Sequence, residues 1–436
     1  MVRNFLKYLF GFFIRFVNFL FAFFNLRVEF NLIKISKTTG REDFFHQLTP
    51  IKLKLNSQKP IVHLAIPYMA REESIFAGTR MILALGASLL KSNIPINFII
   101  TDEIWSGRSE SIAKANFYKY FPDCKTYSFK AISVANESTR ELAIDKDDIF
   151  IATAWWTVHS LKEIFVNEQL KNNKIFYLIQ DFEPGFYPWG AEYALAIETY
   201  KKDIIPIYST ISLKNYFQKE ICIRKENEEC AVYFPEISKK VFYPNKLEYY
   251  KSKRVKKLFC YVRPSIPRNM YQLLIQSLIQ VTHEGIFPEF EWEFWSGGEN
   301  HEHIELGKGH ILKSKGKLSY LEYGEFLRTC DLGISLMYSP HPSYPPFEMA
   351  QSGIVTITNL FPGKDLSTTS KNIISCETNL LSLNMAIKDA FSKHEYYEKR
   401  MEQSILPFPD VYEDCFSEPV KLIKKYHSKS TIENED

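Results

Sequence analysis

The stretch HPSYPPFEMAQSG, residues 341–353, closely follows the apolar run Leu332–Met337, and together they decide the fold. A short apolar run is typical of a buried strand, and the prolines predict a stiff loop that turns into a helix. Phe347 and Ala350 would face the core from that helix. The segment thus predicts a buried strand, a loop and a helix in direct succession.

The start of this helix is also a candidate binding site. Its free backbone N–H groups point back at the loop, and such a helix start favours anions. Glu348 lies in the first turn, where its carboxylate can accept a hydrogen bond from a hydroxyl group. A phosphorylated sugar offers both kinds of group. The alternative is an ordinary strand-to-helix connection.

Short apolar runs alternate with amphipathic segments along the rest of the chain, which predicts parallel, doubly wound sheets. The expected strands are Ile61–Pro67, Ile96–Ile100, Asp148–Thr153, Ile175–Gln180, Ile204–Tyr208, Ala231–Phe234, Leu258–Val262, Phe290–Trp295, His310–Lys313, Leu332–Met337, Ile354–Thr358 and Asn372–Ser375. The expected helices are Gly78–Leu90, Ser109–Tyr120, Val158–Leu170, Trp189–Tyr200, Leu213–Lys219, Asn269–Thr282, Ser319–Arg328, Pro346–Ser352, Leu380–Phe391 and Glu395–Gln403.

The alternation breaks at a polar, lysine-rich stretch that begins at Tyr243-Pro244 and ends near Lys257, as an interdomain linker would. The predicted architecture is therefore α/β, with Rossmann-like domains at residues 60–243 and 257–405. Ligands of such sheets bind at the carboxyl ends of the strands, so the two domains are expected to face a cleft. Residues 406–436 are expected to form a helix and a disordered tail, with the disorder beginning at Ser428.

Composition excludes some classes of protein. The 436 residues carry a net charge of only +3, so no bulk charge favours nucleic acid. The seven cysteines are irregularly spaced and show no metal-ligand pairing, which indicates reduced thiols in the cytosol. The triplet Asp145-Lys146-Asp147 precedes a strand and is interpreted as a charged turn rather than a metal site.

The first 27 residues need a separate account. Residues 4–26 are strongly apolar, and at helical pitch Lys7 and Arg15 fall on one narrow polar stripe beside a wide aromatic face. This pattern is typical of a helix lying in a membrane interface. A transmembrane anchor and a helix folded onto the protein body are the alternatives, although Arg15 at mid-membrane would cost about 2.5 kcal/mol or more.

An aromatic segment with two carboxylates follows the strand Ile175–Gln180. Asp181 and Glu183 stand among rings that include Phe186 and Tyr187. Carboxylates accept hydrogen bonds from sugar hydroxyls and aromatic faces stack on sugar rings, so the segment is a candidate sugar site. The alternative is a turn with solvated acids.

Further candidates in the first domain are weaker. Trp155 and Trp156 close the preceding strand and are expected to lie beside the aromatic segment. Gly78 starts a helix after the first strand, but a single glycine does not make a phosphate loop. His159 next to an apolar run is more often structural than catalytic.

In the second domain, charged residues follow the ends of strands. Arg263 lies at the carboxyl end of the first strand, Arg268 starts the next helix, and Lys317 precedes the N-cap Ser319. Guanidinium groups hold diphosphates through paired hydrogen bonds. Each cation alone is an ordinary surface charge, but Arg263, Lys317 and Glu348 are expected to surround one pocket.

These residues belong to ordered motifs that resemble a known family. The motifs are QDFEP (180–184), GAEY (190–193), YVRP (261–264), GKLS (316–319) and SPHPSYPPFEMA (339–350). They resemble the family-4 glycosyltransferases of the two-domain GT-B fold, closest to bacterial rhamnosyltransferases that build surface-layer and O-antigen-like glycans. The resemblance spans about residues 60–425.

The resemblance implies roles for the residues of the second domain. Arg263 and Lys317 would hold the diphosphate of a nucleotide sugar, and Glu348 would bind the nucleoside ribose or deoxyribose. Pro340 stands where the family often has a second glutamate, so the sugar contacts would come from residues around His341, Ser343 and Tyr344. Arg268 would replace a lysine that the wider family often carries.

The residues from both halves complete the expected site. Its catalytic residues would be Asp181, Glu183, Arg263 and Lys317. Donor binding would use Gly78, Arg263, Arg268, Lys317, His341, Ser343, Tyr344 and Glu348. Acceptor binding would use Trp155, Trp156, Phe186 and Tyr187.

The implied activity is transfer of a sugar, with L-rhamnose from dTDP-L-rhamnose as the expected donor, to a growing surface polysaccharide or lipid-linked glycan. The resemblance implies retention of anomeric configuration, no metal and no cofactor. The protein would act in the cytoplasm, peripherally on the inner face of the cell membrane. A non-enzymatic two-domain sugar-binding protein and an inactive paralogue that scaffolds a glycan-assembly complex are the alternatives.

Overall fold

The computed structural model describes residues 48–432 apart from 58, 72–76, 137–139 and 235. These residues belong to one compact unit, Gln47–Asp436. The expected membrane-interface helix, residues 1–27, lies outside the described residues. Among the helices that are described, none combines the length and the apolar character needed to cross a membrane.

The first domain is built on a seven-stranded sheet with the order β4-β3-β2-β6-β7-β8-β9, in which every pair is parallel. Its strands are β2 (Val62–Ile66), β3 (Ile96–Ile100), β4 (Lys130–Ser133), β6 (Ile149–Ala152), β7 (Ile175–Ile179), β8 (Ile204–Tyr208) and β9 (Ala231–Val232). A separate parallel pair joins β1 (Lys52–Leu55) to β5 (Glu141–Ile144). The helices are α3 (Ala77–Lys91), α4 (Ser109–Tyr120), α5 (Trp155–Ser160), α6 (Ala191–Thr199) and α7 (Ile211–Asn215).

The second domain has a seven-stranded sheet with the order β12-β13-β11-β10-β14-β15-β16, parallel except for the β12–β13 pair. Its strands are β10 (Lys256–Val262), β11 (Trp292–Gly298), β12 (Ile304–Gly307), β13 (His310–Ser314), β14 (Leu332–Ser335), β15 (Val355–Asn359) and β16 (Ile373–Cys376). The helices are α8 (Leu247–Ser252), α9 (Tyr271–His283), α10 (Tyr320–Leu327), α11 (Pro345–Gln351), α12 (Leu380–Lys393) and α13 (Tyr397–Glu402).

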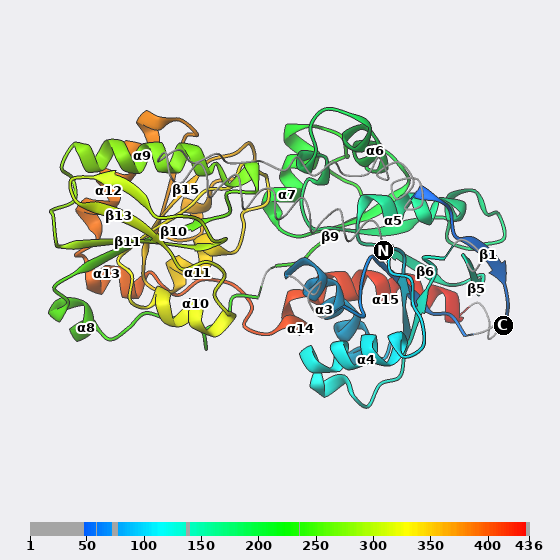
Figure 1. The fold of residues 1–436 in the computed structure, drawn as a ribbon. Coiled ribbons are helices and arrows are strands. Elements are labelled where there is room, and N and C mark those ends of the chain that lie inside the picture. The colour runs from blue at the N-terminus through cyan, green and yellow to red at the C-terminus, as the bar shows by residue number, and fades with distance from the viewer. Residues whose placement is uncertain (1–47, 58, 72–76, 137–139, 235, 433–436) are drawn as a thin grey trace, which may run out of the picture. The chain divides into compact units, whose positions relative to one another are not determined.

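Alternate residues of β10 supply two separate cores, which is why its segment Leu258–Val262 is a continuous apolar run. Leu258, Cys260 and Val262 pack with α9 and α12 on one face of the sheet. Phe259 packs on the other face with Phe347 and the rest of the α10–α11 layer. Figure 1 shows α9 and α12 on one side of this sheet and α10 on the other. The predicted doubly wound sheet is thus confirmed.

The end of the chain returns to the first domain. Helices α14 (Tyr412–Cys415) and α15 (Ser417–Ile432), red in Figure 1, lie beside the blue helix α3. Phe416 and Ile423 are buried in the core formed by β2 and α3. Because α15 continues to Ile432, the prediction that disorder begins at Ser428 was wrong.

The remaining differences between the predicted and the observed elements concern polar or interrupted segments of the sequence. Strands β1, β4, β5 and β12 and helix α8 were not predicted, because they are short and carry exposed polar residues. The predicted helix Val158–Leu170 is instead α5 followed by a 3-10 turn, Lys162–Val166. These elements depend on tertiary contacts more than on a local pattern.

Candidate active site

The carboxyl edge of the second sheet positions the two expected diphosphate ligands. Val262 pairs with Gly298 in the β10–β11 register, and the Gly298 N–H donates to the Gly316 carbonyl over 3.0 Å. Gly298 has a φ of +112°, and a Cβ there would lie 2.6 Å from the Val262 carbonyl oxygen, so a side chain would not fit. Arg263 follows β10 and Lys317 follows β13, and these two strands flank β11, which ends at Gly298. The two exposed residues therefore come after the strands on either side of this glycine.

Glu348 approaches this edge from the first turn of α11. Burial raises the pKa of its carboxyl to about 8, an effect that the Tyr323 hydroxyl reduces. The Tyr261 pKa is raised mainly by burial, lowered by the Arg263 charge and raised by the Glu348 charge. Tyr261 thus lies within electrostatic reach of both residues, and the structure brings Arg263 and Glu348 to one region.

The loop between β14 and α11 is fixed by His341. Its ring Nδ1 accepts the Ser343 N–H over 3.0 Å, so Nε2 carries the proton and donates to the Ser209 hydroxyl over 3.1 Å. Burial lowers the His341 pKa, which favours this neutral form. Ser343 has a φ of 68°, an uncommon conformation for serine, and the His341 contact stabilises it. The rings of His341 and Tyr344 form a T-shaped contact, with 5.8 Å between their centroids.

Arg268 and Asp181 form an ion pair rather than facing solvent separately. The guanidinium Nη1 lies 2.7 Å from the Asp181 carboxylate, and the Ser339 hydroxyl donates to the other carboxylate oxygen. The guanidinium also lies over the ring of Phe186, 4.1 Å from its centroid. These contacts join the loop after β7 to two loops of the second sheet.

Glu183 lies inside the first domain. Its side chain accepts hydrogen bonds from the Trp155 N–H at 2.9 Å and from the Tyr177 hydroxyl at 2.7 Å, and the residue is only 6% exposed. Burial raises its pKa to about 7. The Trp155 indole N–H donates to the Tyr187 hydroxyl over 3.1 Å. A direct role for Glu183 would require these partners to be exchanged for substrate.

The other candidates of the first domain have simpler surroundings. Gly78 faces the Gln180 side chain, since a Cβ at this glycine would lie 3.3 Å from the Gln180 amide oxygen. Trp156 is half-buried, and its indole N–H has no hydrogen-bond partner among the described residues. His159 is held by the Leu195 carbonyl at 3.1 Å, and burial lowers its pKa.

The Asp145-Lys146-Asp147 triplet is a turn, as predicted. The Asp147 N–H donates to the Asp145 carboxylate over 3.0 Å, and both acids are buried. Within the parts of the chain that the structure describes, no cluster of three or more metal-ligating side chains is present.

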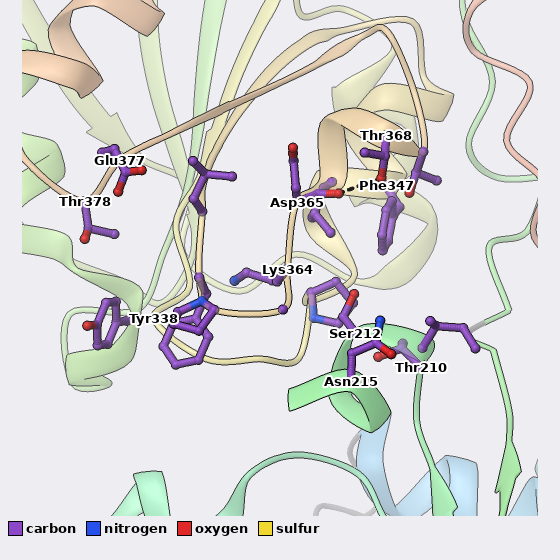
Figure 2. Close-up of a pocket in the computed structure, with 18 of the residues that line it drawn as sticks. Thr210, Ser212, Asn215, Tyr338, Phe347, Lys364, Asp365, Thr368, Glu377 and Thr378 are labelled. Carbon is purple, nitrogen blue, oxygen red and sulfur yellow. Dashed lines mark hydrogen bonds between the residues drawn. The ribbon is translucent and has the colours of Figure 1, made fainter. Parts of the chain in front are cut away.

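A cavity of about 820 Å³ was not anticipated from the sequence. It lies over the ends of β14, β15 and β16 and is also lined by α7 residues (Figure 2). Tyr338, Lys364 and Glu377 belong to its walls. A signal for them was present, because all three follow predicted strands directly or within a short loop.

The sequence also matches a family in both halves. Residues 62–211 match the WsaF N-terminal domain, and residues 256–388 match the WsaF C-terminal domain. The chain belongs to the WsaF family. The first match covers every strand of the first sheet except β9, and the second match covers the whole of the second sheet.

A protein of glycan assembly is similar to part of the chain. The chain is 28% identical over 246 residues to the O-antigen biosynthesis protein RfbC of Myxococcus xanthus, covering 56% of this chain and 18% of that protein. It therefore spans about a fifth of the length of this curated relative.

Solved structures share the fold at low identity. Sucrose-phosphate synthase from Thermosynechococcus elongatus has a TM-score of 0.53 at 8% identity, over 87% of this chain and 100% of that one. WaaG, a glycosyltransferase involved in lipopolysaccharide biosynthesis, has a TM-score of 0.51 at 12% identity, over 83% and 99%. The chain has the GT-B architecture, and the resemblance to GT-B glycosyltransferases related to rhamnosyltransferases is confirmed.

Proposed function

We propose that this chain is a glycosyltransferase that acts on a nucleotide sugar and a growing surface polysaccharide or lipid-linked glycan. The WsaF domains and the O-antigen biosynthesis relative support this assignment. The single observation that carries it is the arrangement of Arg263 and Lys317 on either side of Gly298, with Arg263 and Glu348 both near Tyr261.

The two cations suit a diphosphate leaving group. As the bond between the sugar C1 and the phosphate oxygen breaks, negative charge grows on the diphosphate. Arg263 offers two parallel N–H groups and Lys317 a point charge, and preplaced charges stabilise such a group without reorganisation. Two fixed cations can fill this role in place of a metal ion, so we propose metal-independent transfer.

Glu348 is the proposed ligand of the nucleoside sugar. Its raised pKa means that the carboxyl holds a proton more readily than an exposed glutamate does. A ribose or deoxyribose hydroxyl can donate to the ionised form and so offset the loss of water around the charge. Binding of a nucleotide is therefore expected to lower the Glu348 pKa.

The identity of the donor, the stereochemistry of transfer and the membrane location are proposed from the resemblance to rhamnosyltransferases. We propose dTDP-L-rhamnose as the donor and retention of anomeric configuration, with His341, Ser343 and Tyr344 shaping the sugar pocket beside Pro340. The strained Ser343 backbone and the His341 contacts support a preset loop here. We also propose that residues 1–27 hold the protein on the inner face of the cell membrane.

A panel of nucleotide sugars tests this function. A ligand that binds only the folded state raises the melting temperature, so dTDP-L-rhamnose should raise it more than UDP-sugars do. Release of dTDP in the presence of a membrane-glycan extract should follow. Stabilisation by nucleotide without release, on any acceptor, would favour the inactive scaffold. Stabilisation by free sugars but by no nucleotide would favour the non-enzymatic sugar-binding protein.

A further inference from the structure

The cavity of Figure 2 lies along the carboxyl edge of the second sheet from the two proposed diphosphate ligands, and it adjoins the β14–α11 loop of the proposed donor site. Arg263 and Lys317 follow β10 and β13, whereas the cavity lies over β14, β15 and β16. Pro342, from the loop that His341 fixes, forms part of the cavity wall. Its volume of about 820 Å³ is ample for a ligand of one or two sugar units, since small-molecule sites run from about 300 to 1,000 Å³.

The charges around the cavity do not suit a second nucleotide. Lys364 is the cation among its lining residues, and its Nζ donates to the Met337 carbonyl over 2.7 Å. Burial lowers the Lys364 pKa to about 7, so its positive charge is only partly present at neutral pH. Asp365 and Glu377 bring two carboxylates to the same walls. A diphosphate would meet more negative than positive charge here.

The remaining walls suit a neutral, hydroxyl-rich ligand. The Tyr338 residue is 54% exposed, and its ring is braced edge-on by Phe361 at 4.9 Å between centroids. Such a ring offers a flat apolar face at little entropic cost. Thr378 and the exposed Glu377 follow β16 on the same side of the cavity (Figure 2). Figure 2 also shows the Lys364 side chain extending from its loop toward the side on which Tyr338 lies.

We infer that this cavity is an acceptor subsite for a neutral sugar unit, with the Tyr338 ring against the sugar face and Glu377 accepting from sugar hydroxyls. The inference rests on the proposed function, because it assigns the second substrate of the same reaction. It places part of the acceptor on the second domain, apart from Trp155, Trp156, Phe186 and Tyr187 of the first domain.

Saturation-transfer NMR on the full chain, with dTDP present in excess, tests this subsite. The probes are methyl α-L-rhamnopyranoside, methyl α-D-glucopyranoside and the matched methyl α-D-glucuronide. At least one neutral glycoside should receive saturation that dTDP does not displace, and the glucuronide should receive less than the glucoside. Tyr338→Ala and Glu377→Gln should each reduce the transfer about threefold or more, as loss of a central contact does.

Tyr396→Ala is the matched control, because Tyr396 is also 54% exposed and does not line the cavity. Saturation of no neutral glycoside, equal transfer in Tyr338→Ala and wild type, displacement by dTDP, or preference for the glucuronide would each overturn the subsite. The melting-temperature response to dTDP is recorded on the same samples. Failure of the proposed function would appear there, whereas failure of the subsite would appear only in the glycoside signals.

Discussion

The Arg268 guanidinium lies 2.7 Å from the Asp181 carboxylate, and this pair links loops that belong to different sheets. Both residues were expected in the substrate site, Arg268 on the donor and Asp181 in catalysis. In the structure the Arg268 guanidinium and the Asp181 carboxylate form an ion pair with each other. If Arg268 binds the donor diphosphate, as the resemblance implies, the diphosphate competes with Asp181 for the Nη1 end of the guanidinium, and we expect the pair to oppose donor binding.

Removal of the Asp181 charge should therefore tighten donor binding. We expect Asp181→Asn to lower the dTDP dissociation constant about fivefold, the equivalent of about 1 kcal/mol for a partly buried pair, and Arg268→Ala to raise it. Isothermal titration calorimetry measures both. Asp389→Asn, which breaks a surface pair with Lys393, is the control. Unchanged affinity in both site variants would show that Arg268 does not meet the donor.

Loss of either proposed diphosphate ligand should reduce turnover. Arg263→Ala and Lys317→Ala are each expected to lower kcat/KM roughly tenfold or more, because a charge that stabilises the leaving group is lost. Lys313→Ala is a matched control. Lys313 lies on β13, the strand that leads to Lys317, but it comes before the carboxyl end of that strand. Near-normal turnover in either site variant would refute the assigned role.

The stability of the free protein should depend on Glu348 in a pH-dependent way. With a folded pKa of about 8 against an ordinary 4.5, the folded state keeps a proton that the unfolded state loses between these values. The unfolded state then binds fewer protons, and stability falls as pH rises.

The Glu348→Gln variant should not show this fall in stability with rising pH, because glutamine does not titrate. Its melting temperature should match that of wild type near pH 4.5 and exceed it by about 2 °C or more above pH 8. Differential scanning calorimetry from pH 4.5 to about 9 measures the difference, with Glu325→Gln at an exposed position of α10 as the control. A wild type that is more stable than Glu348→Gln at the alkaline end of this range would contradict the buried, protonated carboxyl. The same variant should bind dTDP more weakly.

Chelation should leave transfer intact. If the two cations alone stabilise the leaving diphosphate, activity in an excess of EDTA, on the order of 10 mM, should equal that in buffer. Release of dTDP from the donor gives the rate. Strict dependence on added Mg²⁺ would show that the diphosphate is held differently.

Deletion of residues 1–27 should move the protein from the membrane fraction to the supernatant. The aromatic face of this segment is expected to lie in the membrane interface. Liposome flotation of the full-length and shortened chains measures the change. A full-length protein that stays in the supernatant without detergent and ignores liposomes would contradict this expectation.

The sequence by itself determined the two-domain architecture, because strands buried on both faces leave continuous apolar runs such as Leu258–Val262 that stand out between amphipathic helices. It also determined which residues follow strand ends, so Arg263, Lys317 and Glu348 could be selected from their positions along the chain alone. The WsaF family match and the GT-B architecture confirmed the resemblance that these motifs carried.

Only the tertiary structure decided what the candidates touch. Asp181 and Glu183 lie two residues apart in one aromatic segment. Glu183 is buried against Trp155, whereas Asp181 is paired with Arg268 of the other domain. No local pattern encodes such partners, because they come from distant parts of the chain. The return of α15 to the first sheet and the cavity beside Tyr338 have the same origin, since each is assembled from segments that only folding brings together.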